Sequence, residues 1–480
     1  MNRNFSLNDL LEIEECDEIL EFKCEKTQIP IWLEVRGLFF RLVKSDKVYT
    51  NNNTYLNHRK VSNAELVINL FKSCLYNIFN SYRKESDVLI TTSSIGFSNH
   101  DDNTNRLSDH FANAHINSLV LLRNKDWKWR KPSNTPTQLF HDPLLIVPSI
   151  YAKISAKFYS NQDIIKFVEF LKIRSFNLIG WRMSDEQYDY LIKYISNVKY
   201  SLPVKYKLYK RFLEKRKVKV LIGLTLCYGS SALVVAAKDL KIVVAEYQHG
   251  VVSSGHTAYN FSQALCSSEL VKRVLPSHFL GYGKWWNESF NAPIEKHIIG
   301  NPHRSEQLKK YYENHKNENN KKRNNILILG DGFETERYIE FAINLNNKLH
   351  QYDVVFRPHP RERTHMQKLI DNKYKNSTII IDDERDIYSS FLFTDIVISE
   401  LSTGLFEAIG LVNRIFIWRT DKSIFALPDI PIATFSSLDD LINKIIDKKE
   451  GYTNALKENE LWATDWKSNY LNFLYIKGNI

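Results

Sequence analysis

Four short clusters of polar residues follow apolar runs in this sequence, and each combines groups that could bind or react with an anionic ligand. The first is EYQHG (246–250), at the end of the run 241–247. A histidine at this position titrates near neutral pH, and the glycine after it lets a ligand approach the backbone. We therefore take His249 as a candidate catalytic residue. The alternative is an ordinary hydrogen-bonded loop histidine.

The second cluster is GDG (330–332), which follows the run 325–330 and precedes a helical segment. Its glycines let the main chain approach a phosphate, and the N-terminus of the following helix offers free N–H groups. Gly330 and Asp331 are therefore candidate binding residues for a phosphate group. A plain tight turn would have the same composition.

The third cluster is RPHP (357–360), after the run 352–357. The two prolines stiffen the backbone around His359. Arg357 beside a histidine suits a phosphate or a diphosphate, because both side chains donate hydrogen bonds to anionic oxygens. The alternative is a rigid structural turn.

The fourth cluster is SELSTGLFE (399–407), after the run 395–399. Ser402 or Thr403 can cap a new helix whose N–H groups face an anion. Glu407 lies one turn further on the same face, where its carboxylate could hold ribose hydroxyls. The alternative is a capped helix with a solvated glutamate.

Two series of alternating strand and helix patterns position these clusters. The first series predicts strands at 86–94, 117–124, 175–181, 218–226 and 241–247, with helices at 162–173, 184–197 and 230–240. The second predicts strands at 325–330, 352–357, 377–382, 395–399 and 414–418, with helices at 334–349, 403–410 and 437–448. Such alternation produces parallel sheets covered on both faces, which bind ligands at the carboxyl ends of their strands. We expect an α/β protein of two Rossmann-like domains whose parallel sheets face a central cleft.

The division between the two series gives approximate domain boundaries. We expect a first domain over 1–290, which includes a helical extension in its first 85 residues, and a second domain over 291–455. The crossover between them lies around 282–301. The tract 311–325 is polar and without periodicity, as in a solvated loop.

Composition and charge restrict the class of partner. The 480 residues are 43% hydrophobic and 25% charged, as in an ordinary globular protein. Lys and Arg number 65 against 55 Asp and Glu, a net charge of +10 that favours an anionic ligand. The basic residues are scattered and form no zinc-finger or basic-zipper pattern, so we expect no nucleic acid partner.

Cysteine usage and hydropathy indicate a cytoplasmic protein. The five cysteines are widely spaced and include no CxxC pair, which argues against a disulfide framework or a structural zinc site. The N-terminal segment does not have the pattern of a signal peptide. Residues 220–237 carry no charge, but the GSS (229–231) within them favours a strand, a turn and a helix over a membrane span.

The motifs QHG (248–250), GNPHR (300–304), RPHP (357–360) and STxxxE (402–407) resemble those of bacterial GT-B glycosyltransferases that assemble capsule and lipopolysaccharide. The likeness is closest to the Kdo and sialic-acid transferases, which carry an HP motif and a paired Ser/Thr motif. The chain is also similar to the teichoic-acid glycerophosphotransferases, which pair an HG histidine with an RxHP histidine. The resemblance covers roughly residues 215–420.

This resemblance implies a GT-B fold with the nucleotide donor in the C-terminal half and the acceptor in the N-terminal half. His249 would reach the reacting centre from the first domain. A helix within 456–480 would cross back onto that domain. The residues implied at the donor are Arg357, His359, Ser402 and Thr403 at its phosphate and Glu407 at its ribose.

A one-step inverting transfer needs a general base for the acceptor hydroxyl and positive groups for the departing phosphate. Arg357, His359 and the helix N-terminus at Ser402 could neutralise the phosphate, so we expect neither metal nor other cofactor. The loop after the strand 86–94 supplies our candidate base, Asp102, although a polar surface loop is the alternative. Glu246 and His249 are the rival candidates for the base.

The leading functional hypothesis is a metal-independent inverting glycosyltransferase that moves Kdo or another CMP-activated acidic sugar onto a growing surface polysaccharide. The alternatives are a CDP-glycerol or CDP-ribitol polyol-phosphate transferase and a transferase that uses UDP- or GDP-sugars. A nucleotide-sugar epimerase and a non-enzymatic binding module also remain open. The expected partners are the nucleotide-sugar donor and a glycan or lipid-linked glycan acceptor, with peripheral contact to the anionic inner face of the cytoplasmic membrane.

Overall fold

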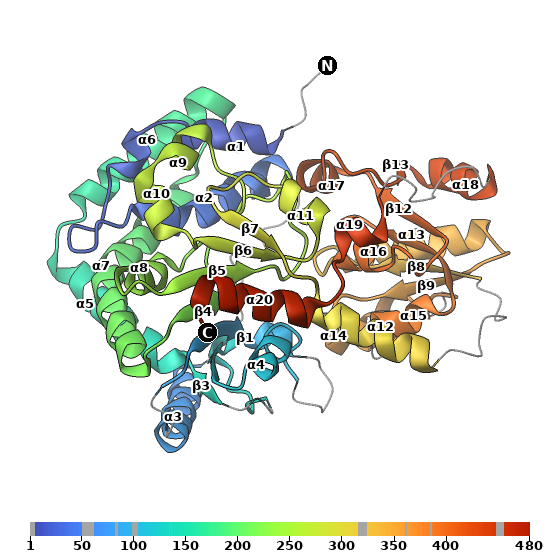
Figure 1. The fold of residues 1–480 in the computed structure, drawn as a ribbon. Helices are drawn as coiled ribbons and strands as arrows, with labels where there is room; N and C mark the ends of the chain where they lie inside the picture. Colours follow the sequence, from blue (N-terminus) through green and yellow to red (C-terminus); the bar gives the residue numbers. More distant parts are fainter. Residues whose placement is uncertain are drawn as a thin grey trace.

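The computed structural model describes two parallel sheets that lie next to each other (Figure 1). The described residues are 5–49, 62–81, 85–97, 104–133, 135, 137–314, 324–360, 362–375, 377–384, 386–447 and 456–480. The expected α/β architecture of two Rossmann-like domains with a cleft between them, the GT-B arrangement, is confirmed.

The first sheet has the strand order β3-β2-β1-β4-β5-β6-β7, and every pairing is parallel. Its strands are β1 (Val88–Ser93), β2 (Ser118–Arg123), β3 (Gln138–Phe140), β4 (Val220–Gly223), β5 (Val243–Tyr247), β6 (His278–Gly281) and β7 (Glu295–Ile298). The central strands are continuous apolar runs because helices cover both faces of the sheet. The boundary that we expected at 290 falls before β7, so the first sheet extends to Ile298.

The second sheet has the order β10-β9-β8-β11-β12-β13, again all parallel. Its strands are β8 (Asn325–Leu329), β9 (Asp353–Arg357), β10 (Ile380–Ile381), β11 (Thr394–Ser399), β12 (Arg414–Trp418) and β13 (Thr434–Phe435). The strands predicted at 325–330, 352–357, 395–399 and 414–418 are therefore confirmed. The one predicted at 377–382 shrinks to a two-residue edge strand.

Helices cover both faces of each sheet. The first domain contains α1 (Leu7–Glu14), α2 (Ile31–Lys47), α3 (Asn63–Asn80), α4 (Asp109–Ala114), α5 (Asp142–Phe158), α6 (Gln162–Ile179), α7 (Asp185–Arg216), α8 (Ser231–Asp239), α9 (Gln263–Ser267), α10 (Glu269–Val274) and α11 (Lys284–Glu288). The remaining helices are α12 (Pro302–Asn314), α13 (Thr335–Lys348), α14 (Arg363–Lys373), α15 (Ile387–Phe391), α16 (Thr403–Glu407), α17 (Asp421–Ala426), α18 (Leu438–Asp447), α19 (Glu458–Leu461) and α20 (Trp466–Gly478).

Alternate residues of the first sheet point to two separate cores. Leu89 and Leu221 belong to the core formed with α1, α2 and α6 to α10, whereas Val88 and Val220 belong to the core formed with α4 and α20. The last helix, α20, thus lies on the first sheet although it follows the whole second domain in sequence (Figure 1).

Aromatic side chains join the two domains. The Trp286 indole donates a hydrogen bond to the carbonyl of Leu461 (2.9 Å), and its ring packs against Phe406 of the second domain. Gly283 is required at this junction, because a Cβ there would lie 2.4 Å from the carbonyl oxygen of Leu461. The two domains are therefore in close contact on one side of the cleft.

The strand predicted at 175–181 is wrong, because α6 continues to Ile179. Gly180 then ends the helix in the left-handed conformation (φ 61°), and its N–H bonds to the carbonyls of Phe176 and Ser175. In contrast, the uncharged tract 220–237 forms β4, a turn and α8, as predicted.

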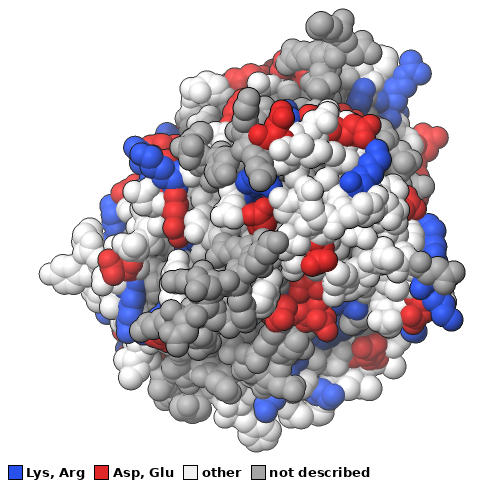
Figure 2. All heavy atoms as spheres, turned by 90° about the vertical axis from the view of Figure 1, so that its right-hand side faces the viewer, with Lys and Arg blue, Asp and Glu red and all other residues white. Residues whose placement is uncertain are grey.

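The surface over the second domain shows Lys, Arg, Asp and Glu side chains interspersed rather than gathered by sign (Figure 2). Among the described residues, no helix combines the length and apolarity that crossing a bilayer requires. The described lining of the cleft between the domains, in contrast, carries more Lys and Arg than Asp and Glu.

Candidate functional site

The cleft between the two sheets has a volume of about 1510 Å³ and is lined by residues of both domains. Its described lining includes ten Lys and Arg side chains against five Asp and Glu. The lining contains all seven residues that we expected to bind the phosphate or ribose of the donor, namely Gly330, Asp331, Arg357, His359, Ser402, Thr403 and Glu407. The carboxyl ends of parallel strands meet at this edge, which is why clusters far apart in sequence converge here.

His249 lies in a smaller pocket at one side of the cleft, together with Thr403 and Glu407 of the second domain. Gln248 fixes the turn that carries it, because its amide donates to the carbonyl of Gly250 (2.8 Å) and accepts from the N–H of Tyr282 (2.8 Å). Burial, together with the nearby Arg106, lowers the pKa of His249 to about 4. The ring is therefore neutral at physiological pH, and its buried Nδ1 has no hydrogen-bond partner among the described residues.

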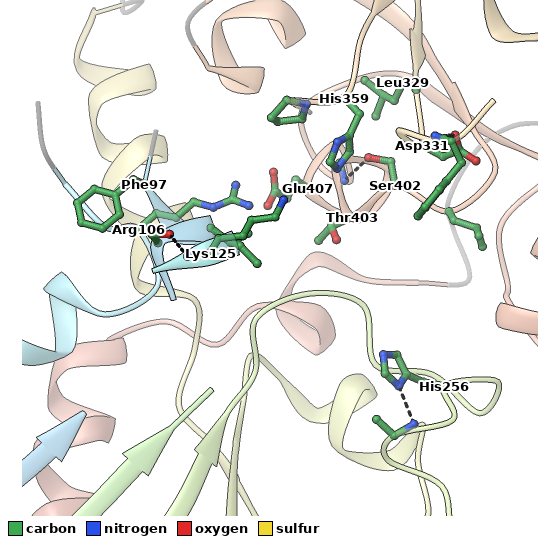
Figure 3. A pocket seen from close by; sticks show the side chains of 18 of the residues that line it. Phe97, Arg106, Lys125, His256, Leu329, Asp331, His359, Ser402, Thr403 and Glu407 are labelled. Atoms are coloured by element: carbon green, nitrogen blue, oxygen red, sulfur yellow. Dashed lines mark hydrogen bonds between the residues drawn. The ribbon is translucent and has the colours of Figure 1, made fainter. Parts of the chain in front are cut away.

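The GDG turn holds His359. Gly332 has a φ of 81°, and a Cβ there would lie 2.9 Å from the His359 ring. A Cβ on Gly330 would lie 3.1 Å from the Phe356 ring. The backbone N–H of His359 donates to Glu362 (3.1 Å). The two glycines thus let the turn close against the histidine, which faces the cleft (Figure 3).

Asp331 lines the cleft, and its carboxylate also pairs with Lys422. Its carboxylate accepts from the N–H groups of Phe333 (2.9 Å) and Glu334 (3.2 Å) and pairs with the ammonium of Lys422 (2.8 Å). Burial alone would raise the pKa of Asp331, but the charge of Lys422 holds it below its usual value. Asp331 therefore shapes the turn and anchors a lysine.

The same lysine occupies the acidic cluster that could otherwise hold a metal in this cleft. Asp331, Glu334 and Glu400 bring their carboxylate oxygens within 4.8 Å of one another. Lys422 pairs with all three, at 2.8 Å for Asp331 and for Glu400. This ammonium and the Arg337 guanidinium, which pairs with Glu334 (3.0 Å) and Glu400 (3.2 Å), thus supply the positive charge that three carboxylates require.

Arg357 is held in place by a carboxylate and a hydroxyl behind it. Its Nη1 donates to Asp382 (2.7 Å) and Ser390 (2.9 Å), and all three residues are buried. Part of its hydrogen-bonding capacity is thus committed to the protein. Its charge still acts in the cleft, where it opposes the rise in the pKa of Glu407.

The last cluster forms a short helix at the boundary of the domains. Ser402 caps α16 by accepting from the N–H of Gly404 (3.2 Å), and the helix ends at Glu407 rather than at 410 as predicted. The Thr403 hydroxyl would lie 3.7 Å from a Cβ on Gly250 of the first domain. Burial raises the pKa of Glu407, against the opposing charge of Arg106.

Several cleft residues were given no role in the sequence analysis. Arg106 extends from the first domain toward Glu407 (Figure 3), and Lys125 and Arg130 lie on the same side of the cleft. His303 of the GNPHR motif lies between the two pockets, and burial lowers its pKa to about 3. The motif itself was the available signal for His303.

Helix α2 lines the first-domain wall of the cleft, which gives the N-terminal extension a role. Arg41 and Lys44 on this helix face the cleft near His256. Burial, with Arg41 nearby, lowers the pKa of Lys44 to about 8. No sequence motif marks these residues as cleft residues.

Of the three candidates for the general base, the structure describes Glu246 and His249. Asp102 lies outside the described residues. Glu246 is fully buried, accepts from the N–H of Cys227 (2.7 Å) and from the Tyr259 hydroxyl, and lines neither pocket. Glu246 is therefore a core residue, and His249 is the one described candidate that lines a pocket.

No protein-family model and no curated protein sequence matches the chain. Solved structures similar to it include UDP-GlcNAc 2-epimerase from Neisseria meningitidis bound to UDP-GlcNAc (15% identity, TM-score 0.43, covering 81% of this chain and 99% of that one). The UDP-GlcNAc 2-epimerase from Methanocaldococcus jannaschii is 12% identical, with a TM-score of 0.42 and coverage of 81% and 99%. The wall teichoic acid polymerase TagF is 12% identical, with a TM-score of 0.40 and coverage of 87% and 94%. Because these values are low, we argue function from the residues of this chain.

Proposed function

We propose that the chain is a GT-B glycosyltransferase that moves a CMP-activated acidic sugar, such as Kdo, onto a growing surface polysaccharide. The observation that carries the proposal is the meeting of His249 and Glu407, from opposite domains, on one pocket beside a basic cleft of about 1510 Å³. A donor with a phosphate and a sugar carboxylate carries at least two negative charges. The excess of Lys and Arg in the cleft lining complements those charges.

The second domain provides the donor side of the proposed site. His359 would contact the donor phosphate beside Arg357, and Ser402 and Thr403 would donate to phosphate oxygens. Glu407 would hold the ribose. Gly330 and Asp331 act through the turn that positions His359, as the contact between Gly332 and that ring indicates.

In the proposed step, the acceptor oxygen forms a bond with the anomeric carbon while the bond from that carbon to the phosphate oxygen breaks. The acceptor proton passes to a base, and the nucleotide leaves with the bonding electron pair. Arg106 and Arg357 would stabilise the negative charge that develops on the phosphate. The proposed transfer uses no metal, because lysine and arginine side chains supply the positive charge.

A second candidate, a polyol-phosphate transferase that uses CDP-glycerol or CDP-ribitol, is favoured by His249 itself. Its neutral ring could accept the proton of an acceptor hydroxyl that attacks phosphorus, and a bound anionic donor would raise its pKa from about 4. Phosphorus in the product separates this candidate from sugar transfer. UDP- and GDP-sugars remain alternative donors, and product formed from the donor alone would indicate an epimerase.

The first test is the thermal stability of the full chain with CMP, CDP, UDP or GDP, each with and without EDTA. A nucleotide at 100 times its dissociation constant should stabilise the protein by about 2.7 kcal/mol. We expect a shift with CMP or CDP that persists in EDTA. A shift with UDP or GDP alone would overturn the cytidine donor, and no shift with any nucleotide would favour a binding module.

The second test separates binding from chemistry. His249→Asn should retain the nucleotide-induced shift but lose turnover by about 100-fold or more. The matched control is His350→Asn, which changes an exposed histidine outside the cleft. Unchanged turnover in His249→Asn would remove this residue from the reaction and leave the base to be sought in the loop that contains Asp102.

The proposal also includes contact with an anionic membrane that carries a lipid-linked acceptor. Two adjacent helices, α3 and α5, expose large apolar side chains while small or polar ones face the protein. On α3, Phe71 and Phe79 are 62% and 76% exposed. On α5, Ile154 and Phe158 are 53% and 79% exposed, whereas Ser155 is buried.

The charges on this surface favour a lipid partner over a second copy of the chain. The exposed charged side chains of α5 are Lys153 and Lys157, which suit anionic headgroups and would face like charges in a symmetric dimer. We expect the full chain to sediment with vesicles that contain phosphatidylglycerol, and Ile154→Gln/Phe158→Gln to reduce that binding about tenfold or more. Ile446→Gln, on an exposed apolar residue of α18, is the control. Dimerisation through this surface, without vesicle binding, would contradict the proposal.

A further inference from the structure

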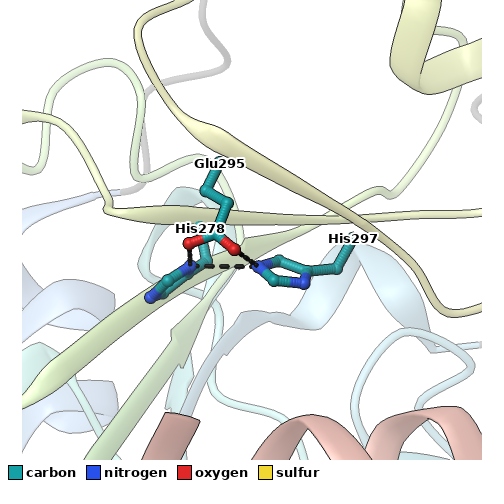
Figure 4. Close-up of side chains that lie close together, drawn as sticks. All are labelled: His278, Glu295 and His297. Carbon is teal, nitrogen blue, oxygen red and sulfur yellow. Dashed lines mark hydrogen bonds and ion pairs between the residues drawn. The ribbon is translucent and has the colours of Figure 1, made fainter.

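Two histidines and a glutamate lie together on β7, which is an edge strand of the first sheet, and on its neighbour β6 (Figure 4). His278 is paired with Glu295 across the two strands, and His297 follows Glu295 by two residues. Because side chains alternate along a strand, all three point to the same face of the sheet. The sequence analysis did not identify this cluster, because its members come from two separate segments.

The distances within the cluster match those within a metal coordination sphere. Nδ1 of His278 lies 3.1 Å from Nε2 of His297 and 3.2 Å from a carboxylate oxygen of Glu295. Nε2 of His297 lies 3.4 Å from the other oxygen. Tetrahedral ligands at about 2.0–2.2 Å from zinc are about 3.3–3.6 Å apart. We infer that His278, Glu295 and His297 form a binding site for a divalent transition metal of the Zn²⁺ class.

The donor chemistry agrees with this geometry. Two imidazoles and one carboxylate suit Zn²⁺ and leave a fourth position for water.

Surrounding residues hold the two rings in place. The Phe473 ring of α20 packs against both, with centroid distances of 5.5 Å to His278 and 5.1 Å to His297. Lys477, one turn further along α20, pairs with both oxygens of Glu295 at 2.9 and 3.1 Å. Lys477 is 31% exposed, so it can turn into solvent when a metal takes its place at the carboxylate.

The position of the site indicates a structural ion. His278 and Glu295 are the first residues of their strands, whereas the cleft lies at the carboxyl ends. A metal here would join β6 and β7 beneath α20, remote from the proposed transfer reaction. Its role is therefore independent of the proposed function.

The test is titration of the full chain with Co²⁺ alone, followed by the visible absorption of tetrahedral Co²⁺, with Zn²⁺ as competitor. We expect Co²⁺ to bind at one site and Zn²⁺ to displace it from that site. His297→Asn should weaken Co²⁺ binding on the order of 100-fold. Losing a residue that coordinates the metal costs at least as much affinity as losing a residue that only hydrogen-bonds to a coordinating side chain. His115→Asn, which changes a partly buried histidine of the same domain beside Asp87, is the matched control.

Lys477 provides a second variant that does not remove a ligand. Lys477→Met should tighten Co²⁺ binding at least about tenfold, because the competing positive charge is removed. Co²⁺ binding that is equal in the wild type and His297→Asn would overturn the inference. So would the lack of a tetrahedral spectrum, or Lys477→Met with unchanged affinity. None of these outcomes depends on nucleotide binding or on turnover.

Discussion

At Gly332 the absence of a side chain positions a histidine. Gly332 has a φ of 81°, and a Cβ at this position would lie only 2.9 Å from the His359 ring. Both features disfavour any larger residue. Gly332→Ala should therefore destabilise the protein by about 1–3 kcal/mol and weaken nucleotide binding. Urea unfolding and nucleotide titration would measure the two effects.

Gly180→Ala is the matched control, since Gly180 has a φ of 61° but nothing lies within 4 Å of its Cβ position. It should share the backbone strain and leave nucleotide binding unchanged. If both variants bind nucleotide equally well, the displacement of His359 is not what weakens binding.

Lys422 is the residue whose charge holds three carboxylates together. Lys422→Met would leave Asp331 without its cation and Glu334 and Glu400 with Arg337 alone, and should cost about 3–5 kcal/mol of stability. Added Mg²⁺ should restore part of that loss. Lys348→Met, which removes an exposed pair with Asp439, should cost no more than about 1 kcal/mol. Urea unfolding of both variants, with and without Mg²⁺, is the measurement, and equal losses in the two would contradict this role.

The sequence identified the candidate residues that follow strands, because parallel strands bring their carboxyl ends to one edge. It placed Arg357, His359 and Glu407 at the cleft for this reason. It could not show that Arg357 is partly committed to Asp382, or that Asp331 pairs with Lys422, because those partners lie far along the chain. Arg41 and Lys44 were missed because only tertiary packing brings α2 to the cleft.

At the scale of elements, sequence patterns failed where edge position or helix length outweighed local composition. Residues 175–181 are apolar enough for a strand, yet they continue the helical period of α6, and Phe176 and Leu178 are 46% and 43% exposed. Gly180, the C-terminal cap, was the overlooked signal. In β7 the sequence EKHI is too polar to indicate a strand, since this edge strand is only partly covered.

A buried ion pair fastens the N-terminal helices to the first domain. Arg36 on α2 donates to both carboxylate oxygens of Glu14 on α1 (2.9 and 2.8 Å) and to the carbonyls of Thr257 and Asn260. Arg36→Met should cost about 3–5 kcal/mol in urea unfolding, because Glu14 would be left buried and charged.

The double variant Glu14→Gln/Arg36→Met should recover part of this stability, since glutamine keeps an acceptor for Trp32 and carries no charge. A double variant as unstable as Arg36→Met would show that the lost hydrogen bonds to the loop, rather than the unpaired charge, set the cost.

For the molecule as a whole, several buried histidines make stability depend on pH. His141 is buried, is hydrogen-bonded to Tyr209 (2.8 Å), and has a pKa lowered to about 3 by burial. The unfolded chain binds a proton at His141 below about pH 6.5, whereas the folded protein does not until about pH 3. The stability that the neutral, buried His141 contributes is therefore complete above pH 6.5 and is lost as the pH falls toward 3.

At pH 5 this one histidine should cost about 2 kcal/mol relative to pH 7. Urea midpoints at pH 7, 6 and 5 should fall steadily, and His141→Gln should flatten the slope by that amount. His350→Gln, at an exposed position, should leave the slope unchanged. An identical slope in His141→Gln and the wild type would show that His141 titrates alike in both states.

The crossing of α20 onto the first sheet has a consequence for biosynthesis. A ribosome makes the first sheet early, but one face of that sheet, with Val88, Val220 and Ile222, is covered by Tyr470 and Leu474 of α20. The nascent first domain therefore carries an open apolar surface while the second domain emerges and folds. The core on this face closes only after translation has passed residue 474, so until then the face exposes apolar surface that a chaperone could bind.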